Sequence, residues 1–133
     1  MTLRYTLILV LLAGVAGLVG CFSSRGDEGE LQYARHCASC HLENGEGLRG
    51  VIPPLKGADF IEKNRQDLAC LIRQGISGPI QVNGVTYNQP MPGNEVLTDA
   101  DVTNIINYMH RKFGSPKEQV PLELVRQKFR ECE

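Results

Sequence analysis

One short run of the sequence combines two thiols with an imidazole. Residues 37–41 form a C-x-x-C-H motif, with thiols at Cys37 and Cys40 and an imidazole at His41. Two thiols at this spacing lie on one side of a helical turn, where both can form thioethers with the vinyl groups of a porphyrin. The next residue then brings an imidazole to the iron. The motif predicts covalent attachment of one haem c through Cys37 and Cys40, with His41 as proximal ligand.

A redox dithiol or half of a zinc site is the other interpretation of this cysteine pair. In that case His41 would be incidental. The sequence has no second cysteine pair and no histidine cluster that would complete a zinc site. Haem attachment is therefore the hypothesis that uses all three residues of the motif.

A second candidate ligand stands far downstream, between two prolines. Residues 88–93 read Asn-Gln-Pro-Met-Pro-Gly and contain Met91. The prolines remove backbone donors and fix φ, so we expect an extended, stiff loop there and no helix. A thioether is a soft donor to iron, and a Met/His pair raises the reduction potential relative to two histidines. Met91 is therefore our candidate for the second axial ligand.

Other side chains could compete for that axial position. Met1 would leave with a signal segment, and His36 directly precedes the C-x-x-C-H motif on the proximal side. Met109 falls on the apolar stripe of an expected helix, and His110 lies at the end of that helix, where a cation is favourable. A vacant or histidine-ligated position remains the alternative to ligation by Met91.

The N-terminus has the pattern of an export signal. Arg4 precedes an uncharged apolar run over 5–19, and the ending Leu-Val-Gly-Cys resembles a bacterial lipobox. We expect 1–20 to be a lipoprotein signal peptide, with lipidation at Cys21 and a membrane-anchored protein in the cell envelope, facing the periplasm or the extracellular side. An uncleaved anchor is the alternative, although the run falls short of the ~20 residues that span a bilayer.

Composition limits the remaining possibilities. The chain has 133 residues, a formal net charge of −1, no Trp and 6% aromatic residues. This length allows one domain with a modest core, which a haem would enlarge. No basic tract is present, so we expect no nucleic-acid partner.

The elements that must position these side chains are mostly helical. Apolar periodicity predicts a helix over 30–40, with Leu31 and Ala34 on its repeating side. Asn64 is expected to cap a second helix that runs to Gln74.

Two further elements flank Met91 in the sequence. Residues 80–87 alternate around Asn83-Gly84, which is a strong signal for a small two-stranded β-hairpin. Thr98, followed by acidic residues, predicts the start of a helix that runs to about Phe113.

Several of these features occur together in a known family. Gly29, Tyr33, the C-x-x-C-H motif, Pro53-Pro54-Leu55 and the proline-bracketed Met91 resemble class I c-type cytochromes. The resemblance covers about 29–114. It implies an all-α, cytochrome c-like helical domain around one covalently bound haem.

The resemblance also implies roles for individual residues. The carbonyl of Pro53 would accept a hydrogen bond from His41, which fixes the ring tautomer and raises ligand basicity. Leu55 would pack on the haem face, and Gly29 would allow the first and last helices of the domain to cross closely. Without the resemblance, Pro53-Pro54 would be only a stiff loop.

The C-terminal tail, 115–133, is less usual for that family. Val120-Pro121 is expected to begin an extra helix over 122–130, whose apolar face includes Val125 and Phe129. The tail helix could serve as a lid on the domain or as a docking element for a partner.

Two cysteines remain once one is assigned to lipid and two to haem. Cys70 and Cys132 both point off their expected helices toward another element. We therefore expect a disulfide between them that pins the tail to the domain and restrains the unfolded chain by about 4 kcal/mol in the entropy model. Two free thiols are the alternative.

The sequence thus predicts a single-haem c-type cytochrome that is an electron-transfer protein and no enzyme. It would carry one electron at a time between exported or membrane-bound redox partners of an electron-transfer chain. The expected organisation is a signal peptide (1–20), a flexible tether (21–28), the cytochrome domain (29–114) and the tail (115–133). The alternatives are a haem enzyme or gas sensor with a labile distal Met91, and an electron-entry subunit held tightly in a larger oxidoreductase.

Overall fold

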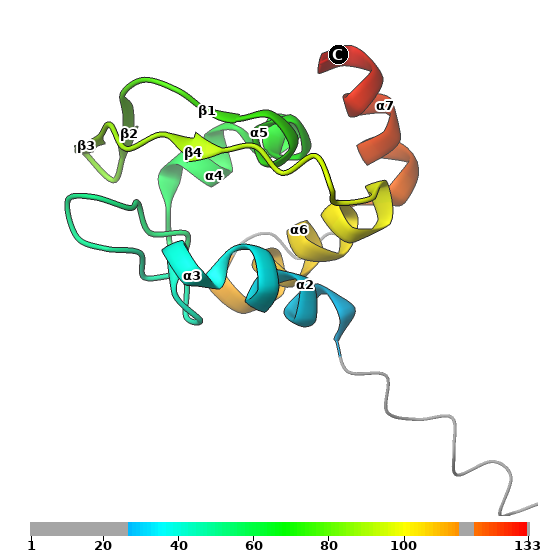
Figure 1. Ribbon diagram of the computed structural model, residues 1–133, viewed down its shortest axis with the longest axis horizontal. Coiled ribbons are helices and arrows are strands. Elements are labelled where there is room, and N and C mark those ends of the chain that lie inside the picture. Colours follow the sequence, from blue (N-terminus) through cyan, green and yellow to red (C-terminus); the bar gives the residue numbers. More distant parts are fainter. Residues whose placement is uncertain (1–26, 115–118, 133) are drawn as a thin grey trace, which may run out of the picture.

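The computed structural model describes residues 27–114 and 119–132. The expected signal peptide and the lipidation site Cys21 lie outside these residues. The elements in chain order are α2 (Glu28–His36), α3 (Ala38–His41), α4 (Asp59–Lys63), the 3-10 helix η2 (Arg65–Asp67), α5 (Leu68–Gln74), β1 (Gly75–Ile76), β2 (Ile80–Val82), β3 (Val85–Tyr87), β4 (Met91–Pro92), α6 (Asp99–Phe113) and α7 (Leu122–Cys132) (Figure 1). This confirms a helical domain with a small β component and an extra C-terminal helix.

No helix in the described part of the chain is both long enough and apolar enough to span a bilayer.

The first and last helices of the domain cross at Gly29. A Cβ atom on Gly29 would lie 2.2 Å from the carbonyl oxygen of Asn104 in α6, so no larger residue fits there. One turn further along α2, the Tyr33 ring lies 5.4 Å from that of Tyr108 and 5.2 Å from that of Phe113, between centroids. The close crossing expected from the family resemblance is present.

The side of α2 that enters the core differs from the sequence expectation. Leu31 is 44% exposed and Ala34 is also exposed, whereas Gly29 and Tyr33 are buried. The prediction that Leu31 and Ala34 lie on the buried side of this helix is therefore wrong. Because α6 approaches so closely, the face of α2 that carries the glycine turns inward, and the apolar Leu31 is left outside.

Both ends of α2 also differ from expectation. The Asp27 carboxylate accepts a hydrogen bond from a first-turn N–H at 3.0 Å, so the helix begins at Glu28, inside the segment expected as tether. At the other end, Cys37 is the C-cap with φ −124° and ψ −37°. The single helix expected over 30–40 is therefore two helices, and α3 is a separate turn.

The helix expected from Asn64 to Gln74 is divided as well. The side-chain amide of Asn64 donates to the carbonyl oxygen of Phe60 at 2.8 Å, and its backbone N–H donates to the same oxygen at 3.0 Å. Asn64 therefore closes the C-terminus of α4, and η2 separates it from α5. On α5, Leu68 and Ile72 are buried.

The β-hairpin lies where the sequence predicted it. Strands β2 and β3 pair antiparallel with Val82 opposite Val85, and Asn83 and Gly84 form the turn with φ values of 52° and 78°. Two positive φ values in succession are what such a two-residue turn requires. The backbone N–H of Asn83 also donates to the Asp59 carboxylate at 2.7 Å, which fastens the turn to α4.

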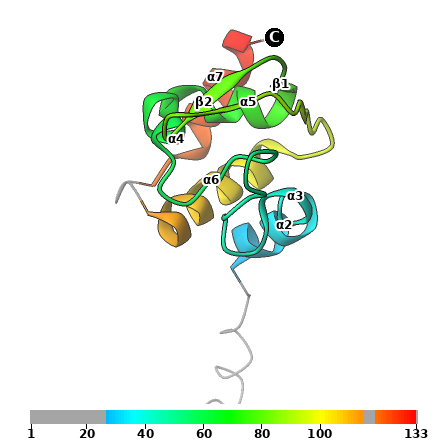
Figure 2. The same ribbon diagram turned by 90° about the vertical axis from the view of Figure 1, so that its left-hand side faces the viewer.

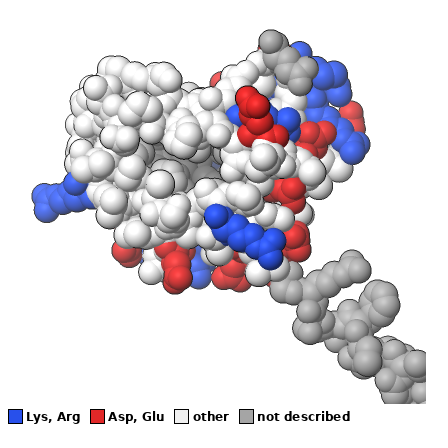
Figure 3. Space-filling view, viewed as in Figure 1, with Lys and Arg blue, Asp and Glu red and all other residues white. Residues whose placement is uncertain are grey.

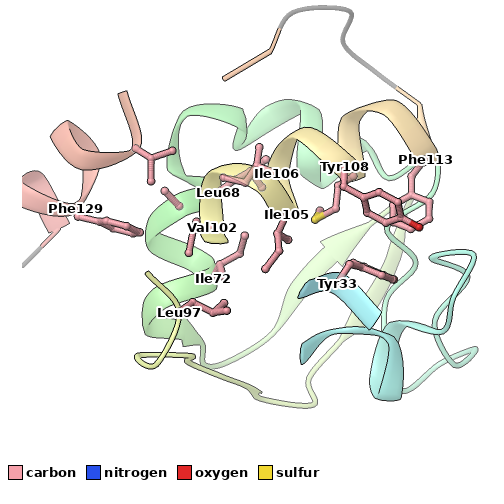
Figure 4. Close-up of a cluster of buried hydrophobic side chains, with 13 residues drawn as sticks. Tyr33, Leu68, Ile72, Leu97, Val102, Ile105, Ile106, Tyr108, Phe113 and Phe129 are labelled. Atoms are coloured by element: carbon pink, nitrogen blue, oxygen red, sulfur yellow. The ribbon is translucent and has the colours of Figure 1, made fainter. Parts of the chain in front are cut away.

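The core is built along α6. Thr98 and Asp101 form a capping box at its start, with hydrogen bonds of 3.2 Å from the Asp101 N–H to the Thr98 hydroxyl and 2.9 Å from the Thr98 N–H to the Asp101 carboxylate. Figure 4 shows Tyr33, Tyr108 and Phe113 together at one end of the buried cluster and Phe129 at the other.

The tail helix α7 covers α5 and α6 on the side away from α3 (Figures 1 and 2). Val125 and Phe129 are its buried side chains. The structure joins Cys70 and Cys132 in a disulfide, with 6.1 Å between their Cα atoms. The helix reaches Cys132, two residues beyond the expected end, and the crosslink holds this last turn on α5.

Candidate haem site

His41 ends the one-turn helix α3 and is prepared as a ligand by its surroundings. Its Nδ1 lies 3.1 Å from the carbonyl oxygen of Pro53. Because a carbonyl oxygen only accepts, Nδ1 carries the proton and Nε2 is the ring's basic nitrogen. Burial lowers the pKa of His41, and the hydrogen bond to Pro53 opposes part of this shift. The neutral imidazole, which is the form that binds iron, is therefore favoured.

The loop after α3 folds back to bring Pro53 to His41. The N–H of Gly47 donates to the carbonyl oxygen of His41 at 3.0 Å. A Cβ atom on Gly47 would lie 2.4 Å from the carbonyl oxygen of Ile52 and 2.6 Å from that of Pro53, and φ at this position is +65°. A glycine is needed here because both the close approach and the backbone conformation exclude a side chain.

Tyr33 supports the same loop in a way that the sequence did not indicate. Its hydroxyl donates to the carbonyl oxygen of Leu42 at 2.7 Å. Leu42 has φ 62°, an unusual value for a residue with a side chain. Burial raises the pKa of Tyr33 well above its usual range, so the hydroxyl keeps its proton. The helix crossing thereby holds the residue that follows His41.

The two thiols of the motif do not form a disulfide. Burial, followed by the charge of Cys40, raises the pKa of the Cys37 thiol to about 11. Reactive redox dithiols have lowered values instead. Among residues 27–114 and 119–132, no group of three or more His, Cys, Asp or Glu side chains could hold a metal ion. Neither the dithiol nor the zinc interpretation gains support from these residues.

One cleft brings together the residues singled out from the sequence. Its empty space, including the open mouth, is about 1330 Å³, and among residues 27–114 and 119–132 no Asp, Glu, Lys or Arg lines it. Figure 3 shows this hollow within a surface that is mostly uncharged. The lining includes all six predicted haem-site residues: Cys37, Cys40, His41, Pro53, Leu55 and Met91.

Met91 reaches the cleft on a short strand. Strand β4 pairs antiparallel with β1, with Met91 opposite Ile76 and Pro92 opposite Gly75. A Cβ atom on Gly75 would lie 2.3 Å from the carbonyl oxygen of Met91, so the two strands touch through their backbones. The expectation of an extended, non-helical segment around Met91 is confirmed.

Comparison with known proteins identifies the family. A family model described as cytochrome c matches residues 26–112. The chain belongs to the cytochrome c family. One cytochrome c-552 of Thermus thermophilus is 32% identical over 120 residues, which cover 87% of this chain and 76% of that protein. A second cytochrome c-552 of Thermus thermophilus is 34% identical over 95 residues, covering 68% and 72% respectively.

A longer relative is subunit CcoP of a cbb3-type cytochrome c oxidase from Rubrivivax gelatinosus, which is 31% identical over 104 residues. These residues are 78% of this chain and only 31% of that protein. In this case the similarity covers one part of a larger polypeptide.

The residues of the cleft fit the cofactor of this family. The cytochrome binds one covalent haem c, and Cys37 and Cys40 have the spacing for both thioether bonds. The apolar lining suits a large apolar ring, and His41 offers an imidazole whose tautomer is already fixed.

Three other candidate ligands have different positions in the cytochrome. Met109 is 7% exposed on the apolar stripe of α6, as expected, but it also lines the cleft. His36 lines the cleft from the end of α2. His110 is buried in the last turn of α6, beside a second hollow with about 530 Å³ of empty space that Phe113 also lines.

Asn94 is a residue of the site that the sequence analysis missed. Its backbone N–H donates to the carbonyl oxygens of Ile72 and Arg73, each at 3.1 Å. Its side-chain nitrogen lies 3.3 Å from Nδ1 of His36. Asn94 therefore connects the Met91 segment to α5 and to the residue before the haem-binding motif. Its position directly after Pro-Gly was the only sign of a turn residue in the sequence.

Proposed function

We propose that this cytochrome is an electron carrier with a single haem, which takes and gives one electron at a time. In this proposal His41 and Met91 are the two axial ligands. The haem supplies one-electron redox chemistry at its iron. The observation that carries the proposal is that Met91, held on a paired strand, lines the same cleft as the haem-binding motif.

The surroundings of the cleft support a carrier more than an enzyme or a gas sensor. A substrate or gas needs an open or displaceable axial position. Prolines flank Met91 on both sides, and its strand is paired with β1. Among the described residues, the cleft lining has no carboxylate or amine that could act as a general acid or base beside a substrate. His36 also lines the cleft, and its Nδ1 lies 3.3 Å from the side-chain nitrogen of Asn94.

We place this carrier at a membrane surface outside the cytoplasm. This part of the proposal rests on the sequence: the signal-like segment 1–20 and the lipobox-like ending at Cys21. The lipid would hold the cytochrome at the membrane, where the partners would be membrane-bound or exported redox proteins of an electron-transfer chain.

A second candidate function is that of an electron-entry subunit in a larger oxidoreductase. The cytochrome c subunit of the quinone-dependent alcohol dehydrogenase from Gluconobacter oxydans is 29% identical over 93 residues, which cover 68% of this chain and 19% of that protein. Together with the similarity to CcoP, this similarity supports a role for the cytochrome domain of this chain as one subunit of a larger enzyme. Stable co-purification with a catalytic subunit in detergent would select this function.

Carbon monoxide binding by the reduced holo-protein separates a carrier from a gas-binding haem protein. We expect wild-type protein to leave its spectrum unchanged under carbon monoxide, because Met91 occupies the sixth position. Met91→Ala should bind carbon monoxide and change the spectrum. Met109→Leu is the matched control, because it removes the other thioether of the cleft, and it should behave as wild type.

Rapid binding of carbon monoxide by the wild type would contradict the carrier proposal. It would show that the sixth position is open, and a haem enzyme or gas sensor would then be the better account.

A further inference from the structure

The segment that carries Met91 is attached to the end of α5. Asn94 caps the last carbonyls of that helix through its N–H, and Pro92 pairs with Gly75 directly after the helix. A Cβ atom on Gly93 would lie 2.6 Å from the carbonyl oxygen of Arg73, so the backbones are in contact there too. The position of Met91 therefore depends on where the last turn of α5 lies.

The helix α5 is also fastened to the tail helix α7, by Cys70 in its first turn and by Arg73 and Gln74 at its end. The disulfide connects Cys70 to Cys132, and the side-chain amide of Gln74 donates to the carbonyl oxygen of Cys132. The guanidinium of Arg73 lies 3.8 Å from the ring centroid of Phe129. Arg73 and Gln74 thus contact α7 through their side chains and the segment that carries Met91 through their backbone.

We propose that α7 and its disulfide are a brace that keeps Met91 on the haem iron. The positioning residues are Cys70, Cys132 and Phe129. This inference rests on the proposed function, in which Met91 is the sixth ligand. It assigns the tail helix a role at the distal side of the site, through α5 and the β1–β4 pair.

The physical basis is the local stability of the Met91 segment. Met91 can leave the iron by rotation of its own side chain or by a movement of β4 relative to β1 and the end of α5, and the second route is the one that α7 would restrain. Segments with few long-range attachments open far more often than the whole protein unfolds. A helix as short as α7 is marginal alone, so the crosslink at its last turn keeps it in place to support α5.

The burial of α7 fits a brace better than a docking helix. Its apolar residues Val125 and Phe129 are buried against the domain. Its outward residues include Glu123 and Arg126, which form an exposed ion pair at 3.7 Å within the helix. Leu124 is 41% exposed, but the face of α7 that carries Val125 and Phe129 is already used inside this molecule.

The test is the rate at which added imidazole replaces Met91 in the ferric holo-protein. When Met91 must leave first, its departure limits this rate. We expect Cys132→Ser to bind imidazole about tenfold faster than wild type. The amide hydrogen of Asn94 should exchange with solvent faster in the variant by a similar factor, a readout that does not depend on haem spectroscopy.

Tyr108→Leu serves as the control for a general loss of stability, because Tyr108 belongs to the aromatic cluster at the α2–α6 crossing. It should lower the free energy of unfolding and leave the rate of imidazole binding unchanged. Phe129→Ala keeps the disulfide but removes the ring against Arg73, and should accelerate imidazole binding about threefold even if Cys132→Ser does not fold. Phe129→Tyr, which restores a ring, should return the rate to that of wild type.

Equal imidazole rates in wild type, Cys132→Ser and Phe129→Ala would overturn the brace and leave α7 as a general stabiliser. If the proposed function itself is wrong and Met91 is not the sixth ligand, the experiment gives a different result. In that case the wild type itself would bind imidazole without delay and would lack the optical signature of a sulfur ligand.

Discussion

His41 and Pro53 show how one hydrogen bond prepares a ligand before any metal is involved. The carbonyl oxygen of Pro53 accepts a hydrogen bond from Nδ1–H of His41, with 3.1 Å between the two heavy atoms, and this leaves Nε2 without a proton. Gly47 makes the arrangement possible, because any side chain there would collide with the loop that carries Pro53. At the scale of the residue, the proximal side of the site therefore depends on the His41 imidazole, on the backbone carbonyl of Pro53 and on the absence of a side chain at Gly47.

Gly29 provides the sharpest prediction at this scale. Gly29→Ala should lower the free energy of unfolding by about 1–3 kcal/mol, because the added Cβ atom would lie 2.2 Å from the Asn104 carbonyl oxygen. Chemical denaturation followed by circular dichroism measures this loss. The control is Glu30→Ala at an exposed position of the same helix, for which we expect a change within about 0.5 kcal/mol.

An increase in stability for Gly29→Ala would contradict the close crossing. Helix propensity alone favours alanine over glycine by about 1 kcal/mol, so the sign of the change decides between the two effects.

At the scale of the element, α6 is the helix on which the core and the crossing depend. Its first turn is closed by the capping box of Thr98 and Asp101. The Asp101 carboxylate accepts hydrogen bonds from the side chain and from the backbone of Thr98. Both lower the pKa of that carboxyl, and the side-chain hydrogen bond has the larger effect. Thr98→Ala should therefore cost about 1 kcal/mol of stability at neutral pH.

The contribution of Asp101 should depend on pH in a defined direction. A carboxyl whose pKa is lower in the folded state stabilises the fold above its unfolded pKa of about 3.9, and this stabilisation is lost as the pH falls through the lower folded value. The difference in unfolding free energy between wild type and Asp101→Asn should thus be largest near neutrality and shrink below about pH 4. Glu46→Gln, at an exposed position, is the control.

A difference between wild type and Asp101→Asn that stays constant down to acid pH would show that the carboxylate does not cap α6.

The elements that the sequence predicted well are those with local signals. The turn at Asn83-Gly84 and the cap at Thr98 are complete within a few residues, so the pattern alone specifies them. The breaks at Cys37 and Asn64 have no such signal. Asn64 ends α4 through a local contact with the Phe60 carbonyl oxygen, but an asparagine is equally suited to begin a helix. At His41, the last residue of α3, the contact is distant, with the Pro53 carbonyl oxygen.

The residues of the site also divide into those that the sequence indicates and those that it does not. Cys37, Cys40, His41 and Met91 were predicted from residue types and spacing, and Pro53 from the family resemblance. All five line the cleft. Asn94 was missed because its role lies in a backbone N–H, which any residue but proline offers, and in a contact with His36 far away in the chain.

At the scale of the whole molecule, charge is distributed unevenly. The sequence has no charged residue within 74–94 or within 50–55, and both stretches contribute to the cleft lining. In Figure 3 the surface immediately to the left of and above the hollow is accordingly uncharged, whereas charged side chains lie to its right and below it. Encounter with a partner at this face would depend on desolvation of apolar surface more than on electrostatic steering.

This distribution predicts a weak salt dependence of electron exchange. The rates of oxidation of the ferrous protein by an anionic and by a cationic inorganic complex should each change less than about twofold between low and high salt. The comparison variant is Val51→Lys, because Val51 is 49% exposed and precedes Ile52 of the cleft lining. It should give opposite salt slopes for the two complexes. Strong, opposite slopes already in the wild type would contradict an uncharged exchange surface.

The optical spectrum of the ferric holo-protein tests the central claim, that Met91 is the axial sulfur ligand, most directly. It should be recorded for wild type, Met91→Ala and Met109→Leu. Our account predicts a weak charge-transfer band near about 695 nm, where sulfur-ligated ferric haem absorbs, in the wild type and in Met109→Leu, and its loss in Met91→Ala. A wild type without the band, or a band that survives Met91→Ala, would contradict the account.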